Sequence, residues 1–229
     1  MKFNDDRILV ILKTILVLFI CFVLYSTLFI APEAEGFVTT SRVIFYHVPM
    51  AWTAVLAFLV SAVYSIRYLK SKNMNHDIYA ASSAQLGFVF SIVATVTGSI
   101  WAKMEWNSFW NWDPRETSIL ILLLIYAAYF SLRSAIENDE QRARLSAVYS
   151  ILAFVTVPFF VFVIPRIITG LHPENPVFET TKEYKMTTSI RLVLFSSILA
   201  FSFLYIWILK LKIDLEKLKK KILFSGDKI

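Results

Sequence analysis

Six long apolar runs dominate the sequence and decide what kind of fold it can adopt. About 20 helical residues cross the ~30 Å hydrocarbon core of a bilayer, and backbone exposed to lipid must satisfy its own hydrogen bonds. We therefore expect an all-α polytopic membrane protein with six transmembrane helices. The fourth run is short, so its helix is expected to begin at Pro114. The expected spans cover residues 8–31, 48–68, 79–100, 114–132, 146–164 and 190–211.

The composition excludes an ordinary soluble globule. Hydrophobic residues make up 57% of the chain and charged residues 17%, whereas soluble domains have about 45–50% and about 25%. The one cysteine, Cys21, excludes an intramolecular disulfide framework and a multi-cysteine metal site. The sequence also has no GxxxxGK[ST] loop, so ATP hydrolysis by a Walker mechanism is excluded.

The positive charges predict an orientation in the membrane. Of the 23 lysines and arginines, 16 fall on the side that holds both termini and 7 on the other side. By the positive-inside rule both termini are expected to be cytoplasmic, so the net charge of +6 orients the helices and does not indicate nucleic acid binding. We expect one six-helix domain over residues 1–229, a first span retained as an anchor, and a basic cytoplasmic tail at 212–229 close to anionic membrane lipid.

The third expected connection, which faces outward, is rich in tryptophan. It reads WAKMEWNSFWNWDPRETS and holds four of the six tryptophans of the chain. Indoles favour the membrane interface, so one interpretation is an aromatic belt. A belt spreads over several helix ends, however, and this cluster lies in one loop. We favour a flat, apolar ligand surface, because indole faces offer a large stacking area. The four residues are Trp101, Trp106, Trp110 and Trp112.

The segment DPRE within this loop has a structural explanation for three of its four residues. Asp113, Pro114 and Glu116 fit a capping box that opens the fourth helix. Capping leaves Arg115 unexplained. An outward guanidinium beside tryptophans is suited to bidentate pairing with a ligand carboxylate.

The chain has three histidines, and two of them are expected on the outer side. His47 lies at the outer start of the second span and His172 follows the outer end of the fifth, whereas His76 lies on the cytoplasmic side. Each one alone is explained by a surface or hydrogen-bonding role. Together they flank the tryptophan loop, so one outward pocket can hold two imidazoles, which ligate iron through a neutral nitrogen. Arg42 adds a second outward cation.

A planar apolar macrocycle with two carboxylates and an axially ligated metal fits this set of residues, and haem is the candidate. A zinc site completed by Asp113 or Glu105 is a weaker alternative, because two histidines without a positioned third ligand bind zinc poorly. The candidate haem-binding residues are Arg42, His47, Trp101, Trp106, Trp110, Trp112, Asp113, Arg115 and His172.

The string WNSFWNWDPRETS resembles the WWD signature of the cytochrome c assembly family of haem-handling membrane proteins. With RVIFYHVPMAW before it and GLHP after it, the chain is most similar to the haem exporter protein C branch, also called cytochrome c maturation protein C. The resemblance implies that His47 and His172 are axial ligands, and that the core of the haem-binding loop consists of Trp106, Trp110, Trp112 and Asp113. The family often has glycine where this chain has Asn107.

The resemblance also implies a function. The chain would hold haem b, transiently and without covalent attachment, at the periplasmic face of a bacterial cytoplasmic membrane. It would pass the haem to a periplasmic haem chaperone, cytochrome c maturation protein E, in association with the ABC-type ATPase and permease subunits of the maturation system. Such a chain is a binding and transfer module rather than an enzyme.

Three other functions match parts of the sequence. An electron-transfer subunit with permanent haem would place its histidines well inside the helices, whereas both lie at loop boundaries here. A solute permease needs polar residues near the middle of the bilayer, where the runs offer little beyond Gln85 and hydroxyl groups. An intramembrane protease or transferase needs a nucleophile and a base, and none stands out at a suitable depth.

Overall fold

The computed structural model describes residues 2–31, 40–172 and 187–226, and within these ranges every regular element is helical. Six helices are long and apolar enough to cross a membrane, which confirms the predicted fold class. Two of the six spans continue into a short π-helix, labelled η1 and η3. The elements are α1 (Lys2–Tyr25), η1 (Ser26–Ile30), the 3₁₀ turn η2 (Thr40–Val43), α2 (Ile44–Ser71), α3 (Met74–Trp106), α4 (Pro114–Ala135), α5 (Asp139–Pro158), η3 (Phe159–Val163), α6 (Ile164–Ile167) and α7 (Thr188–Gly226).

Several helices extend beyond the apolar runs because polar residues cap their ends. The side chain of Asn73 accepts a hydrogen bond from the N–H of Asn75 at 2.9 Å, so α3 begins at Met74 rather than at residue 79. In the same way Asn138 caps α5. Capping side chains satisfy backbone donors that the first turn leaves free. Hydrophobicity marks the part of a helix within lipid, and the caps mark where the helix ends.

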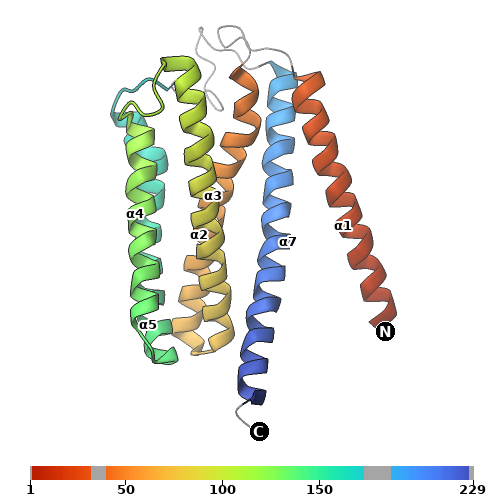
Figure 1. The fold of residues 1–229 in the computed structure, drawn as a ribbon, viewed down its shortest axis with the longest axis vertical. Coiled ribbons are helices and arrows are strands. Elements are labelled where there is room, and N and C mark those ends of the chain that lie inside the picture. Colours follow the sequence, from red (N-terminus) through yellow and green to blue (C-terminus); the bar gives the residue numbers. More distant parts are fainter. Residues whose placement is uncertain (1, 32–39, 173–186, 227–229) are drawn as a thin grey trace.

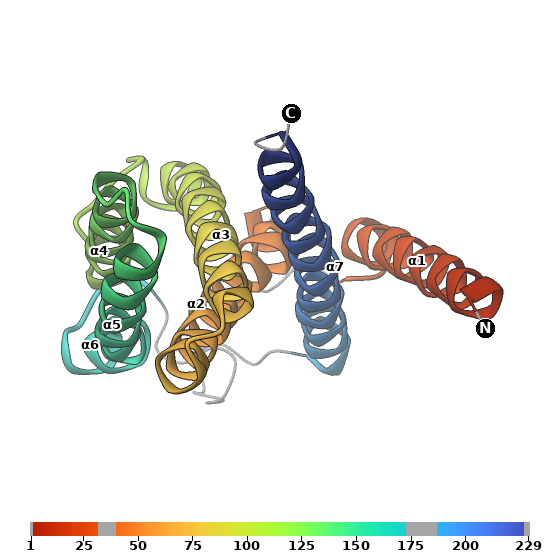
Figure 2. The ribbon, with the colours of Figure 1, turned by 90° about the horizontal axis from the view of Figure 1, so that it is seen from below.

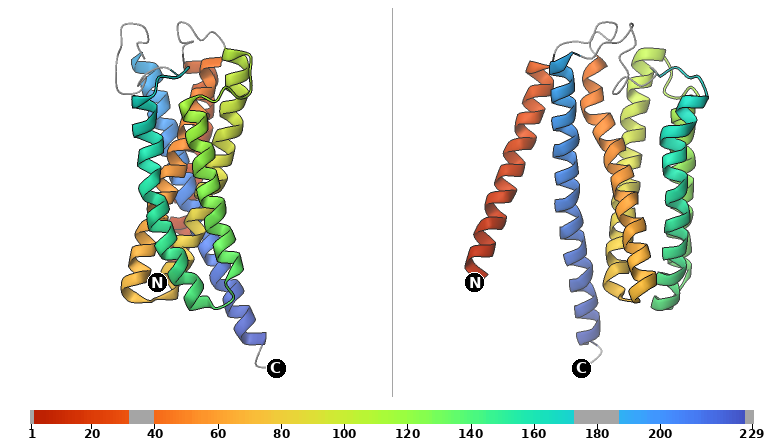
Figure 3. Two further views of the ribbon diagram at one scale, coloured as in Figure 1. Left: turned by 90° about the vertical axis from the view of Figure 1, so that its left-hand side faces the viewer. Right: turned by 180° about the vertical axis from the view of Figure 1, so that it is seen from behind.

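The helices are arranged around the antiparallel pair α2 and α3, which packs along much of its length (Figure 1). Helices α5 and α7 pack against α2, and α4 packs against α5. The view along the bundle shows α4, α5 and α6 on one side of this pair and α7 on the other, with α1 outermost beside α7 (Figure 2). The first and last helices both have their terminal ends at one end of the bundle (Figure 3).

Buried hydroxyl and charged groups join the helices in pairs. The hydroxyl of Ser83 on α3 lies 2.6 Å from the carbonyl oxygen of Ala57 on α2 and 2.7 Å from the hydroxyl of Tyr205 on α7. Near the end that holds the termini, Arg133 on α4 makes a two-pronged ion pair with Asp77 on α3, at 2.7 and 2.9 Å. Interhelical polar contacts of this kind stabilise helix packing in lipid.

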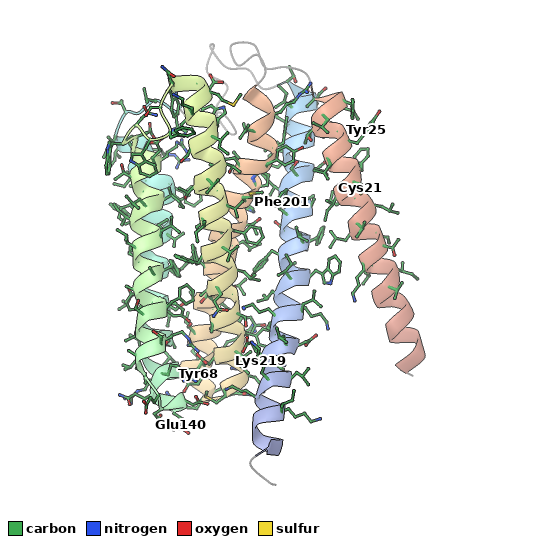
Figure 4. The ribbon with its side chains drawn as sticks, viewed as in Figure 1. Cys21, Tyr25, Tyr68, Glu140, Phe201 and Lys219 are labelled. Atoms are coloured by element: carbon green, nitrogen blue, oxygen red, sulfur yellow. The ribbon has the colours of Figure 1, made fainter. Side chains whose placement is uncertain are left out.

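The connections differ at the two ends of the bundle. At the end that holds the termini, Tyr68 donates a hydrogen bond to the carbonyl of Glu140 at 3.3 Å and ties α2 to the start of α5 (Figure 4). The opposite end brings together the start of α2, the end of α3, the start of α4 and residues 168–172, which follow α6. The predicted site residues lie at this opposite end.

Candidate functional site

His47 lies in the first turn of α2 and points toward α3. Its Nδ1 is 3.0 Å from the carbonyl oxygen of Ala94 and 3.2 Å from the hydroxyl oxygen of Thr97. A backbone carbonyl can only accept, so Nδ1 carries the proton and donates it, which leaves the lone pair on Nε2 free. The prediction had no signal for these α3 partners, because a contact between two helices leaves no mark in either sequence segment.

Gly98 is what lets the imidazole approach α3 so closely. A Cβ atom at this position would lie 2.8 Å from Cε1 of His47, closer than side chains tolerate. Ala94, Gly98 and Trp101 lie on one face of α3, since residues spaced by three, four and seven share a helix face. From Ala94 to Trp101 this face rises about 10 Å. It contacts His47 at one end and His172 at the other.

His172 is held by Asp113, the residue that caps α4. Its Nδ1 lies 2.8 Å from Oδ1 of Asp113, whose side chain is 1% exposed. A carboxylate accepts, so this histidine too carries its proton on Nδ1 and leaves Nε2 free. The N–H of Leu171 donates to the other carboxylate oxygen of Asp113 at 2.6 Å. Gly170 permits this packing, because a Cβ there would lie 2.9 Å from Cδ of Pro114.

The predicted capping box is confirmed. The side chain of Asp113 accepts from the N–H of Arg115 at 2.8 Å, and Glu116 accepts from the N–H groups of Asp113 and Asn111 at 3.4 and 2.7 Å. The same carboxylate that caps α4 therefore also holds the connection after α6. The sequence indicated the first role and gave no sign of the contact with His172.

The four tryptophans of the loop form two pairs. The ring centroids of Trp101 and Trp106 are 4.9 Å apart, and both rings contact His172, at 5.7 and 4.9 Å. Trp110 and Trp112 pack edge to face at 5.8 Å. Among the described contacts, none joins this second pair to either histidine. One of the two pairs therefore lies against an imidazole, and the flat ligand surface stays a prediction.

Three apolar side chains from the end of α3 and the tryptophan loop are exposed. The exposed fractions of Met104, Phe109 and Trp112 are 57%, 59% and 71%. Trp112 also has a φ of 56°, a left-handed conformation that is rare for a bulky residue and is often found at functional sites. A soluble partner or a flat ligand can reach these side chains from outside the bundle.

The charges around His172 set its protonation state. Burial lowers the pKa of His172 to about 4. The carboxylate of Asp113 raises this pKa and so opposes the shift, whereas the positive charge of Arg115 and the interaction with His47 lower it further. Burial raises the pKa of Asp113, but hydrogen bonds from Arg115 and Leu171 and the neighbouring His172 outweigh it, so the pKa lies below 3.8. At neutral pH the site thus holds a neutral imidazole beside a carboxylate.

Arg115 and His47 both interact electrostatically with His172. Arg42 is described in η2, in the last turn before α2, but none of the described contacts joins it to the other site residues. Within the described ranges, no group of three His, Cys, Asp or Glu side chains is arranged to hold a metal ion. Asp113 faces Nδ1 of His172, so it does not act as the third ligand that a zinc site would need.

Comparison with known proteins identifies the family. The family model described as Heme exporter protein C matches residues 2–224. The chain belongs to the haem exporter protein C family. A heme exporter protein C from Paracoccus denitrificans is 29% identical over 85% of this chain and 80% of its own length. One from Rhodobacter capsulatus is 36% identical over 56% of this chain and 52% of its own length, so that match spans only about half of the relative. A ccmC-like mitochondrial protein of cytochrome c biosynthesis from Marchantia polymorpha is 30% identical over 61% of this chain and 58% of its own length.

Asn107 is the position at which the resemblance to the WWD signature led us to expect glycine. Asn107 ends α3 with φ 56° and ψ 17°, the left-handed conformation that glycine adopts without cost. Asparagine is among the few other residues that adopt it readily. Lys103 donates to the carbonyl and side-chain oxygens of Asn107 at 2.9 and 3.0 Å and closes this turn. The substitution therefore keeps the backbone of the loop.

Proposed function

We propose that this chain binds haem at the end of the bundle that holds His47 and His172 and passes it to a haem chaperone during the biogenesis of c-type cytochromes. The observation that carries the proposal is the state of the two imidazoles. In both, Nδ1 is fixed as a donor, and Nε2 keeps its lone pair. Metal-ligating histidines typically donate their second ring N–H in this way, which fixes the tautomer and the ring orientation.

The surrounding residues match the other parts of a haem. Trp101 and Trp106 offer indole faces beside His172, and Trp112 offers an exposed one. Arg115 supplies a cation for a propionate, since guanidinium and carboxylate groups pair bidentately. Arg42 is a second cation for this purpose. The bound group would be haem b, held without a covalent bond as cargo.

The position of the histidines distinguishes this proposal from a permanent haem centre. His47 lies in the first turn of α2, and His172 follows α6 in an irregular connection. Both histidines are near the end of the bundle rather than deep between its helices. At this end a partner domain can reach the edge of the bound ligand. The names of the relatives, heme exporter protein C and a protein of cytochrome c biosynthesis, support the same role.

We propose that the haem end faces the periplasm of a bacterial cytoplasmic membrane, and that both termini and the basic end of α7 are cytoplasmic. The excess of lysine and arginine on the side of the termini supports this orientation. The partners would be the periplasmic chaperone, cytochrome c maturation protein E, and the ABC-type ATPase and permease subunits of the maturation system. The protein would act as a transfer module without catalytic turnover.

The test compares three histidine variants purified in detergent with added haem. Each of His47→Ala and His172→Ala is expected to bind less haem than the unchanged protein in a pyridine haemochrome assay. His76→Ala is the matched control, because His76 lies at the other end of the bundle, with its Nδ1 2.9 Å from the hydroxyl of Ser71. If both outer variants keep as much haem as the control, the proposed ligands are wrong. Co-purification of haem with the chaperone tests the transfer step.

A further inference from the structure

The two candidate ligands differ in what holds them. Nδ1 of His172 donates to a buried carboxylate, that of Asp113, at 2.8 Å. Among the described residues, Nδ1 of His47 faces only uncharged acceptors, the carbonyl of Ala94 at 3.0 Å and the hydroxyl of Thr97 at 3.2 Å. The two imidazoles therefore have one charged and one neutral hydrogen-bond partner.

The carboxylate of Asp113 is fixed in place by other donors. The N–H groups of Arg115 and Leu171 lie 2.8 and 2.6 Å from its two oxygens, and the side chain is almost fully enclosed. Three donors from two separate segments thus converge on one carboxylate. A rigid anion at this position acts on the imidazole continuously, whereas the contacts of His47 carry only partial charges.

The chemical consequence is a difference in ligand strength. A hydrogen bond to a carboxylate draws the Nδ1 proton away and makes Nε2 more basic, and such outer partners tune both ligand affinity and the iron potential. A carbonyl or hydroxyl acceptor has the same effect to a smaller degree. The bond from iron to His172 should therefore be the stronger of the two, most of all for ferric iron.

Resting on the proposed function, we infer that His172 is the retained haem ligand and His47 the exchangeable one. In the exchange step the bond between iron and Nε2 of His47 breaks, and its electron pair stays on the nitrogen. A neutral donor, such as water, takes the vacant position on iron. The oxidation state of the iron does not change. Haem then stays attached through His172 while the other axial position opens.

The first experiment uses glycine variants of the two ligands. His47→Gly protein with added haem is expected to keep a five-coordinate or water-ligated haem, and added imidazole should restore a six-coordinate low-spin absorption spectrum. His172→Gly is expected to lose haem about 10-fold faster than His47→Gly. The haem acceptor in this assay is apomyoglobin. Equal rates of haem loss from the two variants would overturn the assignment, as would faster loss from His47→Gly.

The second experiment removes the charge and keeps an N-cap for α4. Asp113→Asn preserves an N-cap side chain, since asparagine caps helices as well as aspartate does. It is expected to weaken haem binding about 10-fold or more and to raise the haem reduction potential. Glu116→Gln is the matched control, because Glu116 belongs to the same capping box, and its described hydrogen bonds reach only the N–H groups of Asn111 and Asp113.

The outcomes separate this inference from the proposed function. If haem binding survives in every histidine variant, the proposed function fails. If both glycine variants lose haem at the same rate and Asp113→Asn behaves like Glu116→Gln, the inferred difference between a retained and an exchangeable histidine is wrong. The assignment of both histidines as haem ligands is then kept. A raised haem reduction potential in Asp113→Asn, together with an unchanged potential in Glu116→Gln, supports the inferred difference between the two histidines.

Discussion

At the scale of single residues, two glycines permit the contacts that place the histidines. Gly98 leaves room for the ring of His47, and Gly170 lets the connection after α6 pack on the start of α4. Both contacts are possible because glycine has no Cβ atom, which would collide with the neighbouring residue at either position.

We predict that Gly98→Ala impairs haem binding without weakening the helix. Alanine favours a helix over glycine by about 1 kcal/mol, but its Cβ would lie 2.8 Å from Cε1 of His47, so the ring must move. We expect about 10-fold weaker haem binding by absorbance titration. In the control, Gly87→Ala, the new Cβ meets Phe58 at 2.7 Å, so that variant should lower thermal stability and leave the ligation spectrum unchanged. Normal haem affinity in Gly98→Ala would contradict the close packing.

The pKa of His172 predicts how stability depends on pH. Its folded pKa of about 4 lies below the ordinary 6.5, so the unfolded chain takes up the proton first as the pH falls. The stabilising contribution is complete above pH 6.5 and is lost as the pH falls toward 4. The melting temperature of the haem-free protein should decrease as the pH is lowered from about 7.5 to about 4.5. The decrease should be less steep in His172→Gln. Identical slopes would show that His172 is not held neutral.

At the scale of elements, the ends of α3 and α4 decide the shape of the tryptophan loop. Asn107 ends α3 in a left-handed conformation, and Asp113 begins α4 through its capping box. The loop between them is therefore fixed at both sides by backbone geometry. Trp110 and Trp112 lie in this loop, and Trp106 is the last residue of α3.

This arrangement predicts different effects for two substitutions of Asn107. Asn107→Gly should keep stability and haem binding, because glycine adopts positive φ freely. Asn107→Val should destabilise the protein by about 1–2 kcal/mol, since a β-branched residue is strained there. Thermal unfolding followed by tryptophan fluorescence measures both. Equal stability of the two variants would argue against the left-handed turn.

At the scale of the whole molecule, six spans place both termini at the end opposite the histidines (Figure 1). The long helix α7 runs to Gly226 and carries many lysines near its end, and Lys220 reaches Asp139 at the start of α5, with 3.8 Å between the charged atoms. The basic end of the bundle and the end that holds His47 and His172 are thus separated by the length of the helices.

The proposed orientation predicts the behaviour of fusions after Ile229. A green fluorescent protein there should be fluorescent, and alkaline phosphatase should be inactive, because phosphatase needs the periplasm to form its disulfides. Phosphatase inserted within the connection between α6 and α7 should be active. An active C-terminal phosphatase fusion would reverse the orientation.

The sequence by itself determined the six helices, the capping box and the residue types of the site. Apolar runs of spanning length leave the backbone no alternative to helices in lipid, and a capping box is a local pattern of neighbouring residues. These features depend on short stretches of chain, so they can be read without the fold.

Only the tertiary structure decided how the site is assembled. The contacts of His47 with Ala94 and of His172 with Asp113 join residues that are far apart in the chain. The contacts of His172 with the rings of Trp101 and Trp106 likewise join distant parts of the chain. Such contacts arise from the packing of whole helices, and no local pattern encodes them. They give one histidine a charged partner and the other a neutral one.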